Sequence, residues 1–409
     1  LKDLQTLETL ASQAGQTDHI AKVLMLYASY YFVTGDYPNS IDCAKQAEVH
    51  SAYIAKTEAG IYSQLVWSLA LLRLGRSDEA MHRAQTALEH ARTANNRKEE
   101  ARVLTSMGLI ALEQKEPAHA QKYLVEGLEI ARELKDLGLQ ARALNNLAKS
   151  EETVNRNYAI AHQYYEQSYK IAREIGDRNA ESFTLVNLGF AAGMQGDFVA
   201  ARSYHEQSLS VASEIGNKYH EMLTLINLSA VVGLQKDAVV AFQYAHQAAE
   251  LARRISERDG EAWAMLYLGH ACLLLNELKQ AQVAYSKSVE IRHELGQPSL
   301  AMEPIAGLIE TFLQANDLDS AFREAEKILR FLDRGLTLDG TEEPLRVYYA
   351  CYVLLKKKQD PRSKKILQAA MRLLEAQVSK FRDEAARKRY IENIPWRRAI
   401  WDAGQAYAH

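Results

Sequence analysis

The sequence predicts an all-α solenoid: a right-handed superhelix of about eight helical hairpins, followed by a divergent C-terminal hairpin and a capping helix. Three observations carry this prediction. A short turn signal recurs every 40 or 41 residues, small residues recur at fixed distances from it, and four of the seven prolines are confined to residues 298–361. The segments upstream are therefore largely free of the residue that most strongly interrupts helices.

The turn signal keeps its register along residues 35–317. A hairpin of this length cannot bury both of its faces alone, so consecutive hairpins must stack into one continuous array. The turns fall at Gly35-Asp36, Gly75-Arg76, Lys115-Glu116, Arg156-Asn157, Gly196-Asp197, Lys236-Asp237, Asn276-Glu277 and Asn316-Asp317.

Small residues mark the points where helices are expected to pack closely, because two backbones approach only where side chains are short. The position five residues after each turn is Ala or Ser in all eight repeats. A second small position lies seven or eight residues before the turn and a third lies twelve residues after it. Ile309 and Ile328 are the exceptions at these two positions.

The repeat around residue 196 shows how nearby residues are expected to start and stop each helix. Apolar residues recur at helical spacing through residues 181–195. Gly196 can adopt the left-handed conformation that ends a helix, and Asp197 can cap the next helix by accepting hydrogen bonds from its free amides. The second helix then ends at Gly216. Each unit is thus helix, tight turn, helix and short link.

The two ends depart from the repeat. Residues 1–19 are expected to be the remnant of a preceding helix, residues 20–335 the eight-repeat array, and residues 336–409 a divergent, basic hairpin with a capping helix. The last region is predicted to hold a helix from Leu345, a turn at residues 359–361, a long helix through about Arg387, and a final helix opened by Pro395. Because the chain begins with Leu1, we expect it to be part of a longer protein.

The pattern resembles the tetratricopeptide repeat. Asn187-Leu188-Gly189, followed by Gly196-Asp197-Phe198 and Ala201, matches the signature of that family closely. The 40-residue period is longer than usual and resembles the arrays of kinesin light chains, of Leu-Gly-Asn-repeat polarity adaptors and of bacterial signal-transduction ATPases related to the maltose-regulon activator. Residues 389–398 (RYIENIPWRR) also resemble the end of the repeat region in such bacterial regulators. This implies a neighbouring nucleotide-binding domain in the parent chain.

The candidate binding site is the concave groove, which the first helix of each hairpin would face. The resemblance to the long-repeat adaptors implies that asparagines there hold a peptide backbone, through an amide that both donates and accepts. The alternative is that these amides bond the neighbouring helix. The candidate residues are Asn146, Asn187, Asn227 and Tyr267, with Arg102, Arg142, Phe183 and Trp263 one helical turn away.

No sequence motif for catalysis, a cofactor or a metal is found. The chain lacks a phosphate-binding loop, a dinucleotide-binding glycine motif and a nucleophile elbow, and none of its three His-Glu pairs continues into the zinc motif H-E-x-x-H. Its three cysteines, Cys43, Cys272 and Cys351, are too far apart for a metal cluster and are expected to be thiols in the cytoplasm. The sequence therefore predicts a protein that is not an enzyme and binds no cofactor or metal.

Charge is distributed unevenly between the array and the tail. The net charge is −12 over residues 1–344 and +9 over residues 345–409. A basic tail could contact nucleic acid or could cover the solvent side of its helices, and the second interpretation is preferred. No apolar run approaches the roughly 20 residues that cross a membrane, so no membrane association is expected.

Three functions remain open. The leading hypothesis is the sensor or interaction arm of a larger bacterial signalling or transcription-regulating protein, with a protein, peptide or small-molecule effector in the groove. The alternatives are a free-standing adaptor that bridges two proteins, and nucleic-acid contact through the basic tail. The length of the parent gene would separate the first two, and a steep dependence on salt would reveal the third.

Overall fold

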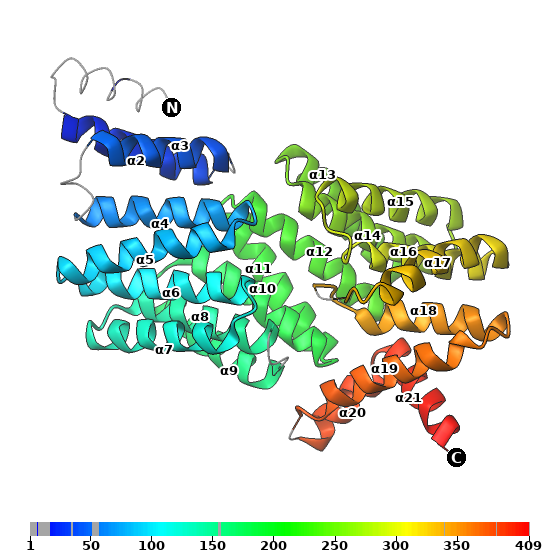
Figure 1. Cartoon of the computed structure of the whole chain (residues 1–409). Helices are drawn as coiled ribbons and strands as arrows, with labels where there is room; N and C mark the ends of the chain where they lie inside the picture. The colour runs from blue at the N-terminus through cyan, green and yellow to red at the C-terminus, as the bar shows by residue number, and fades with distance from the viewer. Residues whose placement is uncertain are drawn as a thin grey trace. The chain divides into compact units, whose positions relative to one another are not determined.

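The computed structural model describes residues 6, 17–33, 36–50, 57–153, 157–338, 340–381 and 383–408, and in these ranges the chain is built of helices and turns without any strand (Figure 1). Most of residues 1–19, together with turn residues Gly35 and Arg156, lie outside the described ranges. The helices are α2 (Thr17–Val33), α3 (Tyr37–His50), α4 (Glu58–Arg73), α5 (Ser77–Thr93), α6 (Arg97–Glu113), α7 (Pro117–Glu133), α8 (Leu137–Thr153), α9 (Tyr158–Glu174), α10 (Arg178–Met194), α11 (Phe198–Glu214), α12 (Lys218–Leu234), α13 (Ala238–Arg254), α14 (Arg258–Leu274), α15 (Leu278–Glu294), α16 (Met302–Gln314), α17 (Leu318–Asp333), α18 (Pro344–Lys357), α19 (Arg362–Val378), α20 (Glu384–Glu392) and α21 (Pro395–Ala408).

The chain forms two compact units. The first comprises residues 1–155 and 163–176, and the second residues 156–162 and 177–409. In each unit consecutive helices pack as hairpins, and the first helix of a hairpin also contacts the first helix of the next: α2, α4, α6 and α8 in one unit, α10, α12, α14, α16 and α18 in the other. This arrangement confirms the predicted all-α solenoid, whereas the predicted domain boundaries at residues 19 and 335 stay predictions.

Left-handed residues close the helices at the predicted turns. Gly75, Gly196, Lys115, Lys236, Asn276 and Asn316 all have positive φ, and so does the second series at the links between hairpins, including Gly176 and Gly216. The predicted cap at Asp197 is also present, because its carboxylate accepts the Ala200 amide at 3.1 Å. The 40-residue period in sequence thus corresponds to a helix stop followed by a helix start.

Matched side-chain sizes set the distance between the helices of a hairpin. A Cβ on Gly189 of α10 would lie 2.4 Å from the His205 ring of α11, and one on Gly108 would lie 2.5 Å from Leu124. In a later repeat, the large Ile309 occupies the position equivalent to Gly189, and Ala325 occupies the position equivalent to His205. Both residues are fully buried in one cluster. The exception at Ile309 is therefore the same packing with large and small residues exchanged.

Serines at the small positions bridge the paired helices. The Oγ of Ser208 donates to the Ser182 carbonyl at 3.0 Å, and Ser288 donates to Ala262 at 2.8 Å. At the equivalent position Gly127, an added Cβ would lie only 3.1 Å from the Ala101 carbonyl oxygen. The position is small because a helix backbone lies directly against it, and a hydroxyl there satisfies its hydrogen bond inside the core.

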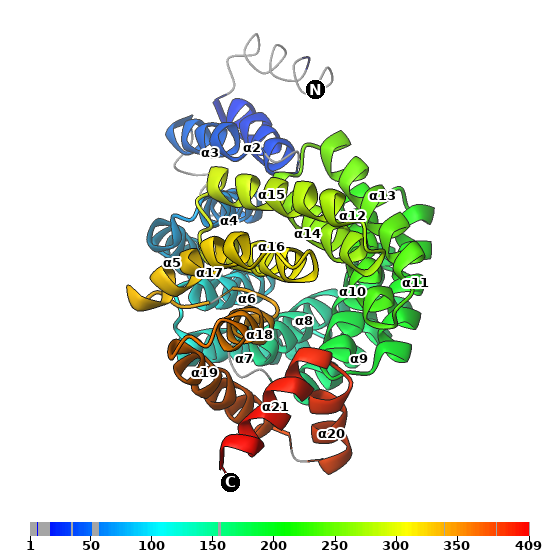
Figure 2. The same ribbon diagram turned by 90° about the vertical axis from the view of Figure 1, so that its right-hand side faces the viewer.

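The predicted long helix through Arg387 was wrong. Helix α19 ends at Val378 and a separate helix, α20, begins at Glu384. The break has two causes, one local and one tertiary. Asp383 caps α20 by accepting the Ala386 amide at 2.9 Å, and Phe381 turns inward to pack on Tyr390 at 4.9 Å between ring centroids. The predicted start of the last helix at Pro395 was correct. Figure 2 shows α21, in red, close to α18 and α19, and α20 packs against α21.

Replacing a left-handed lysine with glycine is expected to stabilise the protein. Lys115 has φ +59°, a conformation that costs a residue with a Cβ roughly 1–2 kcal/mol, part of which glycine loses again through backbone entropy. Lys115→Gly should therefore raise the free energy of unfolding by about 0.5–1 kcal/mol in urea denaturation. The matched control is Lys122→Gly on the exposed side of α7, which should lower it by about 1 kcal/mol. Destabilisation by both variants would contradict this account of the turn.

Two glycines of one helix should respond oppositely to alanine. Gly189→Ala places a methyl group against the buried His205 ring and should lower the free energy of unfolding by about 1–3 kcal/mol. At Gly193, four residues later in α10, the nearest atom would lie 3.7 Å away, so Gly193→Ala should stabilise by up to about 1 kcal/mol through helix propensity. Chemical denaturation of the two variants measures the difference, and equal effects would refute the size-matching argument.

Candidate functional site

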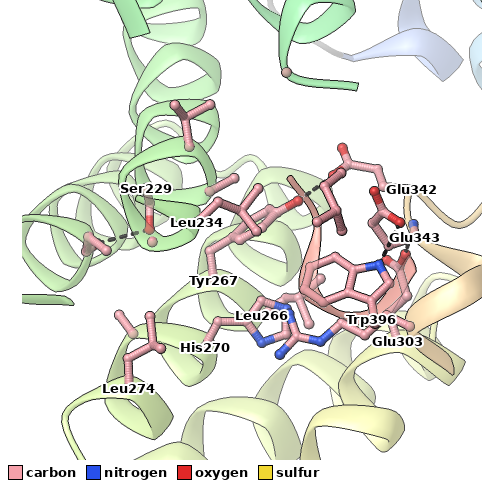
Figure 3. A pocket seen from close by; sticks show the side chains of 18 of the residues that line it. Ser229, Leu234, Leu266, Tyr267, His270, Leu274, Glu303, Glu342, Glu343 and Trp396 are labelled. Carbon is pink, nitrogen blue, oxygen red and sulfur yellow. Dashed lines mark hydrogen bonds between the residues drawn. The ribbon is translucent and has the colours of Figure 1, made fainter. Parts of the chain in front are cut away.

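The second unit contains a cavity of about 490 Å³ on the side where its first helices lie next to one another. Helices α10, α12, α14, α16 and α18 all contribute to its wall, and residues 394–396 of the C-terminal region complete it. Most of the wall is apolar, and Phe190 and Met194 are among the lining residues. Figure 3 shows Leu234, Leu266 and Leu274 in the same wall. The volume is within the range of ordinary small-molecule sites.

One end of the cavity is acidic. Glu303 of α16 lies beside Glu342 and Glu343, which precede α18, and we call these three residues the carboxylate cluster. The amide of Glu343 donates to Glu303 Oε1 at 2.6 Å, and the Tyr267 hydroxyl donates to Glu342 Oε2 (Figure 3). Residues from α14, α16 and the link before α18 therefore meet at one point.

Glu303 is the least satisfied member of the carboxylate cluster. Its side chain is 7% exposed, and its Oε2 has no hydrogen-bond partner among the described residues. Burial, reinforced by the charges of Glu342 and Glu343, raises the pKa of Glu303 to about 8, despite the opposing backbone hydrogen bond and the positive charge of Arg292. A carboxyl group that would be ionised in water is thus held mostly neutral near neutral pH.

A C-terminal segment forms one side of the cavity. We call residues 393–397 the closing segment. Arg397 is 1% exposed and pairs with Glu343, while the Trp396 indole nitrogen donates to the same carboxylate at 3.0 Å. Arg397 also donates to the Met194 carbonyl at 3.1 Å, and the Asn393 amide nitrogen donates to the Gly196 carbonyl at 2.8 Å. The closing segment thus connects the end of α10 to the carboxylate cluster.

The histidines beside the cavity are not placed to change charge near neutral pH. Burial lowers the pKa of His205 to about 3. Burial, with help from the positive Arg346, also lowers the pKa of His270 well below its ordinary value, and its Nδ1 lies 2.6 Å from the Tyr285 hydroxyl. Both rings therefore serve as neutral, packed parts of the wall.

Comparison with known proteins identifies the repeats. The tetratricopeptide repeat family model matches residues 139–214, and no curated protein matches the chain. Among solved structures, the chain is similar to a Signal Transduction ATPase with Numerous Domains protein with a tetratricopeptide repeat sensor from Pyrococcus horikoshii. The two are 18% identical, with a TM-score of 0.58 over 78% of this chain and 48% of that protein. The chain thus spans about half of the archaeal protein.

Two further solved structures are similar over nearly their whole length. The apo form of the quorum sensor NprR from B. thuringiensis is 14% identical, with a TM-score of 0.58 over 86% of this chain and 97% of that one. A Rap protein complexed with Competence and Sporulation Factor is 15% identical, with a TM-score of 0.53 over 85% and 98%. The chain carries a tetratricopeptide-like repeat region. At these identities the likeness establishes the fold alone.

Two of the candidate groove residues line the cavity in these tetratricopeptide-like repeats. Asn227 of α12 and Tyr267 of α14 contribute to its wall, and no hydrogen bond to the Asn227 side chain is found among the described residues. Asn187, Phe183 and Trp263 belong to the same unit but do not line the cavity. Their binding role stays a prediction.

The residues outside the cavity have structural neighbours of their own. Phe183 stacks on His220 at 5.5 Å, and Trp263 is covered by the Arg292 guanidinium at 4.5 Å. The remaining candidates, Arg102, Arg142 and Asn146, belong to the first unit, where Arg102 pairs with Glu99. The structure therefore brings together two of the eight candidates.

The sequence analysis missed the carboxylate cluster and the closing segment. Glu342 and Glu343 lie in the segment that breaks the repeat register, and Trp396 and Arg397 lie in the phrase at residues 389–398. The second phrase carries the resemblance to bacterial regulators, but no spacing rule connects Glu343 with Arg397, 54 positions later. Only folding places them at the same cavity.

Cations of the basic tail pair with acidic residues of the repeats. Lys358 contacts Asp319 at 2.9 Å, Lys365 contacts Asp333 at 3.3 Å, and Arg346 holds Glu310 through two hydrogen bonds. The tail thus neutralises part of the array. Among the described residues, no group of three metal-ligating side chains could hold a metal ion, and no helix is long and apolar enough to cross a membrane.

Glu303→Gln should remove a pH dependence of stability. In the wild type, the pKa of Glu303 is about 8 in the folded state against an ordinary 4.5, so the folded protein binds the extra proton between these values. The free energy of unfolding of the wild type should therefore fall as pH rises from about 5 to about 8. The free energy of unfolding of Glu303→Gln should be about 2–4 kcal/mol higher than that of the wild type near pH 9 and equal to it near pH 5.

Urea denaturation across this pH range measures the difference, with Glu250→Gln on the exposed surface as the control. That variant should follow the wild type at every pH. A constant offset between wild type and Glu303→Gln would mean that Glu303 titrates normally.

Proposed function

We propose that this chain is a non-catalytic, cytoplasmic sensor arm of a larger bacterial signalling protein and that it binds a small-molecule or short peptide effector in the cavity of its second unit. The single observation that carries the proposal is that this cavity is lined jointly by five first helices and the closing segment. A ligand inside would contact both, so its binding energy would shift the equilibrium between an attached and a released closing segment.

The chemistry of the wall supports a ligand rather than a packing defect. An empty cavity inside a protein is ordinarily apolar, whereas this one presents Asn227, the Tyr267 ring and a buried carboxyl group with an unused oxygen. Convergent polar groups on an apolar wall are the usual form of a small-ligand site.

The names of the similar structures agree with a sensor. One is described as having a tetratricopeptide repeat sensor, another as a quorum sensor, and the Rap protein was solved with Competence and Sporulation Factor. The near-complete coverage of NprR and the Rap protein favours a second candidate, a free-standing regulator that acts on a partner protein. The length of the parent gene separates the two.

The proposal is tested with the low-molecular-mass fraction of the source cell. This fraction should raise the melting temperature of the wild-type protein by about 2–4 °C at saturating ligand. Ala230→Trp, which fills the cavity from α12, should lose the shift. Val239→Trp at a 57% exposed site on the neighbouring α13 should keep it.

Hydrogen exchange then tests the sensing step. Amide exchange in the closing segment should change on addition of the fraction in wild type and Val239→Trp but not in Ala230→Trp. Equal melting shifts in all three proteins would place the ligand elsewhere. Absence of any shift in the wild type would refute the effector role.

A further inference from the structure

The carboxylate cluster indicates what kind of ligand the cavity takes. Its three acidic side chains come from two places in the chain, yet they meet at one end of an apolar space. Like charges placed together repel, and near neutral pH this repulsion is relieved because Glu303 stays mostly protonated; a cation beside the cluster would instead favour three ionised carboxylates.

The neighbouring cations are engaged with other carboxylates. Arg397 pairs with Glu343, Arg346 holds Glu310 at 2.6 and 3.1 Å, and Arg292 contacts Asp259 at 2.5 Å. Among the described residues, none of these ion pairs includes Glu303. The protein thus leaves one buried carboxyl group for a partner from outside.

Glu303 also has an unused oxygen, which becomes an acceptor when a cation placed beside it favours loss of the Glu303 proton. Its Oε1 is held by the Glu343 amide at 2.6 Å, while its Oε2 is buried without a partner, in a side chain that is 93% covered. A buried polar atom without a partner costs free energy, which a ligand donor placed there would recover. This atom is an observation independent of the acidic composition of the cluster.

The rest of the wall indicates the chemistry of the part of the ligand that lies away from the carboxylate cluster. Leu266, Leu274, Phe190 and the Trp396 ring present apolar surface, and the volume of about 490 Å³ exceeds what an ammonium group alone would fill. A ligand that satisfies both halves has one charged donor and an apolar body.

Resting on the proposed function, we infer that the effector of this cavity is an organic cation with an apolar body, whose ammonium or guanidinium group binds the carboxylate cluster at Glu303. A free amine and the N-terminus of a short apolar peptide share this chemistry. Within the described part of the chain no three side chains are arranged to hold a metal ion, which favours an organic cation over a metal.

Three compounds of matched shape test the charge. Phenethylamine, phenethyl alcohol and phenylacetate carry the same ring with a positive, neutral or negative end. Calorimetric titration of the full chain should show phenethylamine binding about tenfold or more tightly than phenethyl alcohol, and phenylacetate binding more weakly still. Equal affinities for all three would overturn the inference, since the apolar body alone would then be recognised.

Variants locate the charged contact. Glu303→Gln keeps the size of the side chain and should reduce phenethylamine affinity about tenfold or more while leaving phenethyl alcohol unchanged. Glu250→Gln on the exposed surface should change neither. A preference for the amine that survives Glu303→Gln would overturn the assignment of the site.

A dipeptide pair distinguishes the two sources of the cation. Leucyl-phenylalanine amide should bind and its N-acetyl derivative should not, if a peptide N-terminus is the natural group. Binding of phenethylamine without the dipeptide would point to a free amine, and either result supports a cation. If no amine binds while the cell fraction still shifts the wild-type melting temperature, the ligand class is wrong and the proposed sensor function survives.

Discussion

The close approach of the two helices within each hairpin is the constraint on which the rest of this structure depends. At Gly108, Gly189 and Gly269 the second helix places a large side chain where a Cβ would otherwise stand. With Ile309 facing Ala325 the sizes are exchanged. In these four hairpins the paired side chains are complementary in volume, because close packing tolerates neither a void nor an overlap. Other repeats pair two small residues at the same positions, as Ser68 and Ala84 do.

This spacing places the first helices side by side and so creates the wall of the cavity. Because consecutive first helices contact one another, residues from five of them line one cavity: α10, α12, α14, α16 and α18. A segment from the chain's own C-terminal region forms one side of this cavity. The same segment contains Arg397, which is only 1% exposed. The cost of burying its charge is offset by hydrogen bonds that Arg397 donates to Glu343 and to two backbone carbonyls.

The parts of the fold that could be predicted are those determined locally. Gly196 and Asp197 stop one helix and start the next through contacts within a few residues, so the sequence pattern is sufficient for them. The end of α19 was missed because the inward turn of Phe381 depends on a tertiary contact with Tyr390. The candidate site shows the same division. Asn227 and Tyr267 were found by repeat position, whereas Glu343 and Arg397 meet through a separation of 54 residues that no period describes. Glu303 and Glu343 lie one repeat period apart, but that spacing alone does not mark either of them as a site residue.

The closing segment is also where ligand binding and conformation are most directly linked. Glu343 receives the Arg397 guanidinium and the Trp396 indole, and it donates its own amide to Glu303. A cation at Glu303 would change the electrostatic field at the residue that holds the closing segment, without needing to touch Arg397. Since a buried ion pair is stable only while its surroundings compensate its desolvation, a change in that field alters the balance between attached and released states. Because Glu303 is mostly neutral near neutral pH, a cation that binds there favours loss of the Glu303 proton and places an ion pair where a neutral carboxyl group stood, beside Glu343. An effector of the inferred class would therefore act on the closing segment in two ways, through this change of charge beside Glu343 and through an apolar body packed against Trp396.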